Sequence, residues 1–322
     1  MGLGITGWDW AIFVTAVVIF LLLDLGVFHR KAHEVKFKEA LAWSTTWFIL
    51  AFVFAFLIAP RMAENWTSVD RNEFITGYII ELSLSMDNVF VIALIFQYFA
   101  VPLRYQHRVL FWGILGALVM RGLMIWLGTE LINRFQFFLY ILGAFLLFTG
   151  IKMVFTGDDD EIEPEKNFFV KLTRRFFPVT TEYHGSHFAI KDKEKGGWVL
   201  TPLALVLVMV ETTDLIFAVD SIPAIFGVTT KPFIVFTSNV FAILGLRSLY
   251  FVLAGAIGFF RYLKVGLSLV LCFIGFKMLI AKWYHIETKV SLFVVAAIIG
   301  TSILMSLLAS QREARAAKKK RK

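Results

Sequence analysis

Carboxylates interrupt two apolar segments of the chain, and both segments show the same spacing. In "GYIIELSLSMDNVFV" (77–91) the acids are Glu81 and Asp87. In "VMVETTDLIFAVDSIPAIF" (208–226) they are Asp214 and Asp220, with Glu211 three residues before Asp214. An ionised side chain at the centre of a membrane costs roughly 2.5–3.5 kcal/mol on insertion scales. Acids in such places bind cations or carry protons, so these five residues are the first candidates for chemistry.

Oxygen is the main donor type near these acids. An amide follows the first pair and a hydroxyl follows the second, whereas the six histidines are expected in connections or at helix ends and the single cysteine, Cys272, is isolated. This disfavours zinc and copper, because those metals select nitrogen and sulfur ligands, and it favours Mg²⁺, Ca²⁺ or Mn²⁺. The predicted metal ligands are Glu81, Asp87, Asn88, Glu211, Asp214, Asp220 and Ser221.

Basic residues inside apolar segments offer a second interpretation of the same acids. Arg121, Arg247, Lys152 and Lys277 could pair with the carboxylates and form a buried ion-pair network that holds the helices together. Arg121, Arg247 and Asp24, an acid near the end of the first apolar segment, are therefore auxiliary or proton-coupling candidates. The sequence leaves open which acids bind metal and which pair with cations or carry protons.

The whole chain is too apolar for a soluble protein. Of its 322 residues, 58% are hydrophobic and 17% are charged, against about 25% charged in ordinary soluble proteins, and its mean hydropathy is +0.75. The apolar runs are long and continuous, unlike the alternating segments of a membrane β-barrel. We predict an all-α polytopic membrane protein with nine transmembrane helices, at about 8–28, 44–60, 74–99, 109–128, 136–155, 199–226, 233–256, 262–282 and 288–309.

Lysine and arginine are concentrated in alternate connections, which predicts the orientation. They place the N-terminus outside and the C-terminal tail "QREARAAKKKRK" in the cytoplasm. The net charge of +8 is then a topology signal and does not indicate nucleic-acid binding. The long cytoplasmic loop 156–198 contains an acidic run (158–161) and "FFVKLTRRFF" (168–177), an amphipathic segment that fits the surface of the inner leaflet.

The chain also resembles itself, which indicates a duplication. "ELSLSMDN" (81–88) is matched by "DLIFAVDS" (214–221), "RGLMIWLG" (121–128) by "RSLYFVLAG" (247–255), and "FTGIKM" (148–153) by "FIGFKM" (273–278). Because each unit contains three helices, the two copies would cross the membrane in opposite directions, as inverted repeats of transporters do. The predicted organisation is 1–72 for two N-terminal helices, 73–155 for the first repeat, 156–198 for the loop, 199–283 for the second repeat and 284–322 for the last helix and basic tail.

Inversion predicts how the acids are arranged in depth. Glu81 and Asp220 would lie on the outer side of the membrane centre, and Asp87 and Asp214 on the inner side. A helix break is expected at Pro223, because proline has no N–H to bond the carbonyl of Val219.

The segments quoted above, together with "TSNVFAILGLRSLYF" (237–251), resemble the signature segments of the TerC family of integral membrane proteins, and most closely its Alx-like branch. The likeness covers most of the chain and is weakest in 156–198 and in the tail. It implies a nine-helix bacterial inner-membrane exporter of manganese. It also implies that the family's functional acids correspond to the candidates above and to Asp24, and that Asn239 could reach the same cavity.

The leading functional hypothesis is a secondary exporter that moves Mn²⁺ out of the cytoplasm, with proton exchange on the same carboxylates as a natural coupling. The sequence contains no Walker A motif to suggest ATP as the driving force. It contains no G-x-G-D motif of an intramembrane protease either, so we expect neither an enzyme nor a prosthetic group. The alternative is a non-transporting accessory protein that binds metal for envelope stress or for metallation of secreted proteins. The expected partners are the divalent cation and the lipid bilayer, and the oligomeric state is left open.

Overall fold

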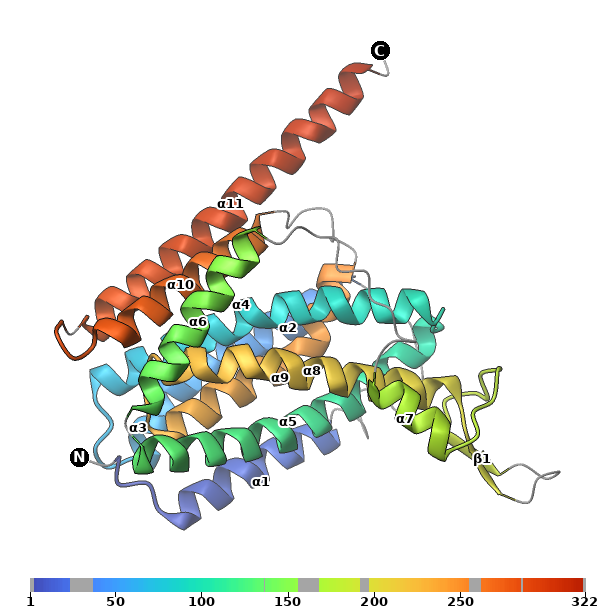
Figure 1. The fold of residues 1–322 in the computed structure, drawn as a ribbon, viewed down its shortest axis with the longest axis horizontal. Helices are drawn as coiled ribbons and strands as arrows, with labels where there is room; N and C mark the ends of the chain where they lie inside the picture. Colours follow the sequence, from blue (N-terminus) through green and yellow to red (C-terminus); the bar gives the residue numbers. More distant parts are fainter. Residues whose placement is uncertain are drawn as a thin grey trace.

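A computed structural model describes residues 3–23, 37–135, 137–155, 168–191, 197–254, 262–284 and 286–320 (Figure 1). Its first half consists of α1 (Gly7–Leu23), α2 (Phe37–Val53) continuing through the π-helical turn η2 (Phe54–Ile58) into α3 (Ala59–Met62), α4 (Ser68–Tyr98), α5 (Leu103–Arg134) and α6 (Phe138–Phe155). The second half consists of α7 (Phe168–Phe176), β1 (Ala189–Lys191), β2 (Trp198–Leu200), α8 (Pro202–Phe226), α9 (Pro232–Ala254), α10 (Leu263–Ile280) and α11 (Thr288–Lys320).

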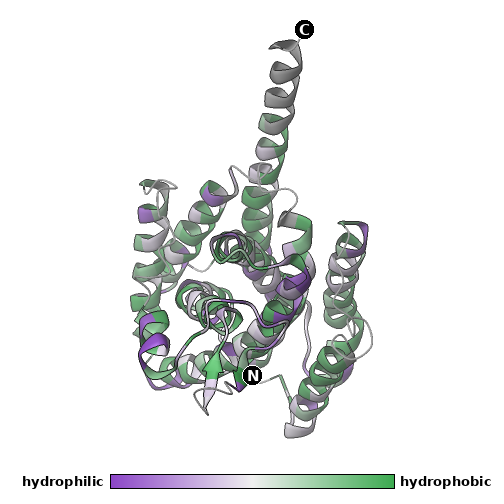
Figure 2. Cartoon of the chain, turned by 90° about the vertical axis from the view of Figure 1, so that its right-hand side faces the viewer, coloured by the Kyte–Doolittle hydropathy of each residue, from purple (hydrophilic) through white to green (hydrophobic). Residues whose placement is uncertain are grey.

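The described helices fit a membrane protein. Six of them are long and apolar enough to cross a bilayer, namely 37–62, 68–98, 103–134, 202–226, 232–252 and 288–309, and 7–22 and 138–153 are shorter apolar helices. Large apolar side chains are exposed on many of them, and apolar colours cover much of the helical surface in Figure 2. Such a surface is stable against lipid tails and would be costly in water. The prediction of an all-α membrane protein is therefore confirmed, whereas the crossing of nine helices stays a prediction.

Several predicted boundaries and features are corrected. The fourth predicted helix, 109–128, is α5 and extends over Leu103–Arg134, so His107 lies near the start of this helix, where it is buried. α11 continues to Lys320, through most of the predicted basic tail, and projects beyond the other helices in Figure 1. The break expected at Pro223 is absent, since α8 is one continuous helix from Pro202 to Phe226.

Sequence signals set the starts of the central helices. Thr67 and Asp70 form a capping box at the start of α4: the Asp70 carboxylate accepts from Thr67 N at 2.7 Å, and Asp70 N donates to Thr67 Oγ1 at 3.3 Å. α8 begins with Pro202 and α9 with Pro232, positions where a missing N–H removes no helical bond. These caps fix where the segments that bear the candidate acids begin.

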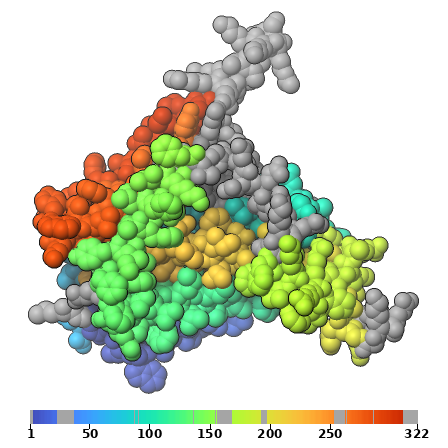
Figure 3. Space-filling model, in the orientation of Figure 1, coloured from blue at the N-terminus to red at the C-terminus, as the bar shows by residue number. Residues whose placement is uncertain are grey.

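Each helix of the first predicted repeat packs against its counterpart in the second. α4 contacts α8, α5 contacts α9 and α6 contacts α10, while α4 also packs on α9 and α5 on α8. α4 and α8 are antiparallel: a Cβ on Gly77 would lie 3.1 Å from Ile225, whereas further along α4 the Asn88 side chain meets Asp214. These contacts are the ones that inverted repeats require, although the duplication itself stays a prediction. Figure 3 shows α6 crossing over α8 on one face.

The crossing of α6 and α10 depends on glycine. A Cβ on Gly150 would lie 2.9 Å from the backbone nitrogen of Cys272, and a Cβ on Gly275 would lie 2.6 Å from the backbone nitrogen of Leu147. Gly150 and Gly275 are the equivalent glycines of "FTGIKM" and "FIGFKM". Each copy of the motif therefore supplies the bare backbone on which the other helix packs.

In the predicted cytoplasmic loop, the described part contains α7 and a two-stranded antiparallel sheet, in which Ala189 pairs with Leu200 and Lys191 with Trp198. The sequence did not predict this hairpin. The acidic run 158–161 lies outside the described residues.

Candidate functional site

One arginine joins two of the predicted acids at the centre of the bundle. Arg121 of α5 donates from Nη2 to Asp214 Oδ1 at 2.9 Å and from Nε to Asp214 Oδ2 at 3.2 Å, and its Nη1 is ion-paired with Glu81 of α4. The exposed fractions of Arg121, Glu81 and Asp214 are 2%, 1% and 8%. Three helices are therefore joined by a buried, charge-assisted contact, in which the guanidinium fork is matched to one carboxylate.

Two predicted neutral ligands complete this cluster. Asn88 Nδ2 donates to Asp214 Oδ1 at 3.4 Å, and Arg121 Nη1 donates to Ser221 Oγ at 3.4 Å. Both side chains are buried. We call Glu81, Asn88, Arg121, Asp214 and Ser221 the central cluster. It gathers one amide, one hydroxyl and two carboxylates around a single guanidinium.

Several buried oxygens in and beside the central cluster lack hydrogen-bond partners within the described part of the chain. They include Glu81 Oε2, Asn88 Oδ1 and Ser85 Oγ, all from α4. An unsatisfied buried acceptor costs about 1–3 kcal/mol, so such atoms indicate water, an ion or another state of the protein. These oxygens are acceptors that a cation could use.

Glu211 lies one helical turn from Asp214 but outside the central cluster. Its carboxylate packs against α5 at Gly116, where a Cβ would collide with it, and Oε2 has no hydrogen-bond partner among the described residues. Glycine at this place lets the acid reach the backbone of the neighbouring helix.

Asp220 lines a separate cavity of about 50 Å³, next to Ser221 and Asn88. Leu84, Met153, Phe217, Leu267 and Leu271 form its apolar walls. The volume is enough for ordered water. Since Asn88 and Ser221 belong to both features, this cavity adjoins the central cluster.

The remaining predicted site residues do not belong to the central cluster. Arg247 and Asp214 line a second cavity of about 20 Å³. Asn239 is buried in α9, and its amide atoms have no hydrogen-bond partner in the described ranges. Asp87 belongs to the α4 helix, but its side chain lies outside the described part, as does the whole of Asp24.

The central cluster is not a preformed metal centre of acids alone. Among the described residues, no group of three or more His, Cys, Asp or Glu side chains could hold a metal ion. The alternative interpretation, a buried ion-pair network, accounts for the contacts of Arg121 with Glu81 and Asp214. It does not explain why buried oxygens of α4 have no hydrogen-bond partner among the described residues.

Sequence reasoning missed a second charged cluster, at the other end of α4. Lys231 Nζ donates to Asp70 Oδ1 at 2.5 Å and to Glu73 Oε2 at 3.1 Å, and Thr229 Oγ1 donates to Glu73 Oε2 at 2.7 Å. Burial lowers the pKa of Lys231, but the hydrogen bonds to the two acids outweigh it, so the pKa lies above its ordinary value. Lys231 lies in the connection between α8 and α9, and its acidic partners on α4 are far away in the sequence.

Comparisons with known proteins agree with the resemblance. Residues 66–315 match the family model described as Integral membrane protein TerC family. An uncharacterized membrane protein of Myxococcus xanthus is 51% identical over 305 residues, covering 94% of this chain and 92% of that protein. A protein of Escherichia coli (strain K12) named putative membrane-bound redox modulator Alx is 46% identical over 308 residues, covering 94% of this chain and 95% of that protein. No solved structure matches.

Proposed function

Because the chain belongs to the TerC family of integral membrane proteins, we propose that it is a secondary transporter that exports a divalent metal cation, Mn²⁺, from the cytoplasm. The cation binds at the central cluster, between the two helices that carry the repeated acidic motif. No enzymatic step and no prosthetic group take part.

The observation that carries the proposal is the shared guanidinium of Arg121. Two buried carboxylates, Glu81 and Asp214, come from equivalent positions of two repeated motifs and meet the same cation. A fixed positive group thus occupies the space between oxygens that would otherwise face a metal ion. A buried ion pair adds little stability over apolar packing, so stability alone is a weak reason for such a cluster.

In the proposed cycle, Arg121 withdraws from one acid as the metal ion arrives. The ion then binds carboxylate oxygens of α4 and α8, with the Asn88 and Ser221 oxygens beside them. Glu81 Oε2 and Asn88 Oδ1 have no hydrogen-bond partner among the described residues, so they can bind the ion without losing one. When the ion leaves, Arg121 returns and prevents two bare acids from facing each other.

Oxygen donors select a hard divalent cation, and the family resemblance selects Mn²⁺ among Mn²⁺, Mg²⁺ and Ca²⁺. Protons provide a natural counter-flow, since the loss of one M²⁺ from two carboxylates is balanced by the binding of two protons. The relatives named putative redox modulators suggest another role. This chain has a single cysteine, so it cannot cycle an internal disulfide, and we propose that any effect on redox state is an indirect result of metal export.

The test is uptake of ⁵⁴Mn²⁺ by proteoliposomes that contain the purified full chain, with and without a pH gradient. We expect uptake above that of protein-free vesicles, stimulated by an opposing proton gradient and competed by unlabelled Mn²⁺ more than by Mg²⁺ or Ca²⁺. Binding of Mn²⁺ without flux under either condition would support the non-transporting accessory protein instead.

A further inference from the structure

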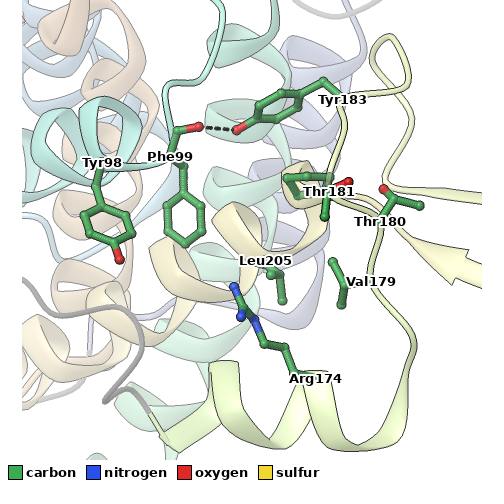
Figure 4. A pocket seen from close by; sticks show the side chains of 9 residues that line it. Tyr98, Phe99, Arg174, Val179, Thr180, Thr181, Tyr183 and Leu205 are labelled. Carbon is green, nitrogen blue, oxygen red and sulfur yellow. Dashed lines mark hydrogen bonds between the residues drawn. The ribbon is translucent and has the colours of Figure 1, made fainter.

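A hollow lies away from the central cluster, where α4 ends and α8 begins. It has a volume of about 540 Å³ and is enclosed by the end of α4, the start of α8, α7 and the segment before β1. Figure 4 shows Arg174 of α7 extending toward Leu205, with Phe99, Thr181 and Tyr183 around the same opening.

The walls of this hollow are fixed to the membrane-spanning helices. Tyr183 Oη donates to the carbonyl oxygen of Phe99 at 2.6 Å, and Arg108 Nη1 of α5 donates to Ser186 Oγ at 2.6 Å. Val170 of α7 is buried in the same apolar cluster as Leu203 of α8. The hollow is therefore held at the depth at which α4 ends and α8 begins.

α7 has two faces of opposite character. Its apolar face exposes Phe168 and Phe176, with exposed fractions of 67% and 68%, and also Phe169 and Leu172. Its other face carries Lys171, Arg174 and Arg175. A short helix with basic residues on one face and large apolar side chains on the other is typical of helices that lie in the plane of a membrane surface.

Aromatic residues around the hollow indicate the same depth. Tyr98, at the end of α4, and Tyr183 both line it, and Tyr98 exposes more than half of its surface. Tyrosine is enriched where hydrocarbon meets head groups. The hollow therefore fits the depth of the lipid head groups.

We propose that this hollow binds the head group of an anionic phospholipid. The phosphate meets the guanidinium of Arg174, the hydroxyl of Thr181 lies within the same site, and the acyl chains leave along the apolar side chains that line the hollow, Phe99 and Leu205. Arginine suits this role because its planar fork binds two phosphate oxygens together. By the predicted orientation, this lipid belongs to the cytoplasmic leaflet, whose anionic lipids attract basic segments.

The experiment is native mass spectrometry of the full chain in detergent, titrated with phosphatidylglycerol or phosphatidylcholine. We expect a tightly retained phosphatidylglycerol and no equivalent phosphatidylcholine. Arg174→Gln should weaken phosphatidylglycerol binding about tenfold, the effect of one charge-assisted contact. Thr181→Val, which keeps the shape of the side chain and removes an uncharged hydroxyl, should weaken it less. The matched control is Arg134→Gln, which removes a surface arginine paired with Glu130 at the opposite end of α5.

Three results would overturn the proposal. The first is equal binding of the two lipids, and the second is an Arg174→Gln variant that keeps wild-type affinity while its thermal unfolding is unchanged. The third is full displacement of phosphatidylglycerol by millimolar inorganic phosphate, which would assign the site to a soluble anion. If Arg174→Gln unfolds, Thr181→Val and the lipid comparison in wild-type protein still decide the matter.

Discussion

Arg121 donates two hydrogen bonds to the carboxylate of Asp214, although the two residues lie on different helices and belong to different predicted repeats. The same guanidinium also pairs with Glu81, the residue equivalent to Asp214 in the first motif. One fixed positive charge therefore meets two negative charges in a nearly inaccessible place. Asn88 of α4, which is also buried, donates a hydrogen bond to Asp214. This arrangement makes the acids tolerable in an apolar bundle and makes Arg121 the natural competitor of any cation that binds there.

Replacing Arg121 with methionine should strongly destabilise the protein. The change leaves two buried carboxylates without a partner, and breaking a buried pair in this way costs about 3–5 kcal/mol. We expect a large fall in melting temperature in detergent, measured by the loss of folded protein on size-exclusion chromatography after heating. Millimolar Mn²⁺ should restore more of the melting temperature in the variant than in wild-type protein, because the ion can replace the missing charge.

Arg134→Gln is the control for Arg121→Met, since Arg134 is exposed and pairs with Glu130 on the surface of the same helix. Exposed pairs contribute about 0–1 kcal/mol, so this control should melt like wild type. An Arg121→Met protein as stable as the control would mean that the acids are neutral or find another cation.

The fold was largely predictable because apolar length decides where helices form in a membrane. The ends were less predictable. The apolar run that predicts α5 ends before polar residues such as Arg104 and Glu130, although the helix itself includes them. The hairpin of β1 and β2 was missed because three-residue strands leave no pattern, and the break at Pro223 was wrong because packing keeps α8 intact around one lost hydrogen bond.

The acids of the site were visible in the sequence, but their partners were not. Spacing along the chain showed that Glu81 and Asp214 are equivalent, and an apolar context showed that each needs compensation. The sequence could not tell which of four internal basic residues supplies this compensation, because that choice depends on how α5 packs against α8, which in turn contacts α4. The Lys231 contacts with Asp70 and Glu73 were missed for the same reason.

Adding a methyl group at the α6–α10 crossing should destabilise the protein at either glycine. In Gly150→Ala the new Cβ would lie 2.9 Å from Cys272 N, and in Gly275→Ala it would lie 2.6 Å from Leu147 N. Backbone cannot yield as a flexible side chain does, so we expect a cost of about 1–3 kcal/mol for each change. Thermal unfolding of the two variants measures it.

Gly300→Ala is the matched control for the two glycine changes. Gly300 lies in α11, and a Cβ there would meet nothing within 4 Å. Alanine favours a helix over glycine by up to about 1 kcal/mol, so this variant should be neutral or slightly more stable. Equal destabilisation of all three variants would show that close packing at the α6–α10 crossing is not the cause.

The cluster of Lys231 with Asp70 and Glu73 should add stability that depends on pH. Because the pKa of Lys231 in the folded protein lies above the ordinary value of 10.5, its contribution is fully present below pH 10.5 and is lost as the pH rises through the folded pKa. Lys231→Met should therefore lower the melting temperature at pH 8, and the difference from wild type should shrink above pH 10.5. A difference that is constant from pH 8 to pH 11.5 would contradict an electrostatic role.

Asp214→Asn and Asp220→Asn should differ in their effects on stability and on Mn²⁺ export. Asp214 is held by Arg121, so Asp214→Asn should lower both stability and Mn²⁺ export. Asp220 lines the cavity beside Asn88 and forms no ion pair within the described part of the chain. Asp220→Asn should therefore keep its unfolding free energy within about 0.5 kcal/mol of wild type, as changes away from packed or paired groups do. It should still reduce export at least about tenfold, the loss expected when a charged ligand becomes neutral.

The Asp220 comparison is read from ⁵⁴Mn²⁺ flux in proteoliposomes, normalised to the amount of folded protein. Glu130→Gln is the control, because it removes an acid from the exposed pair with Arg134 and should change neither quantity. If Asp220→Asn transports like this control, the cavity that Asp220 lines lies off the path of the ion, and the proposed route narrows to the acids held by Arg121. If Asp220→Asn instead unfolds, Asp220 has a structural partner, and its assignment to the ion path loses its support.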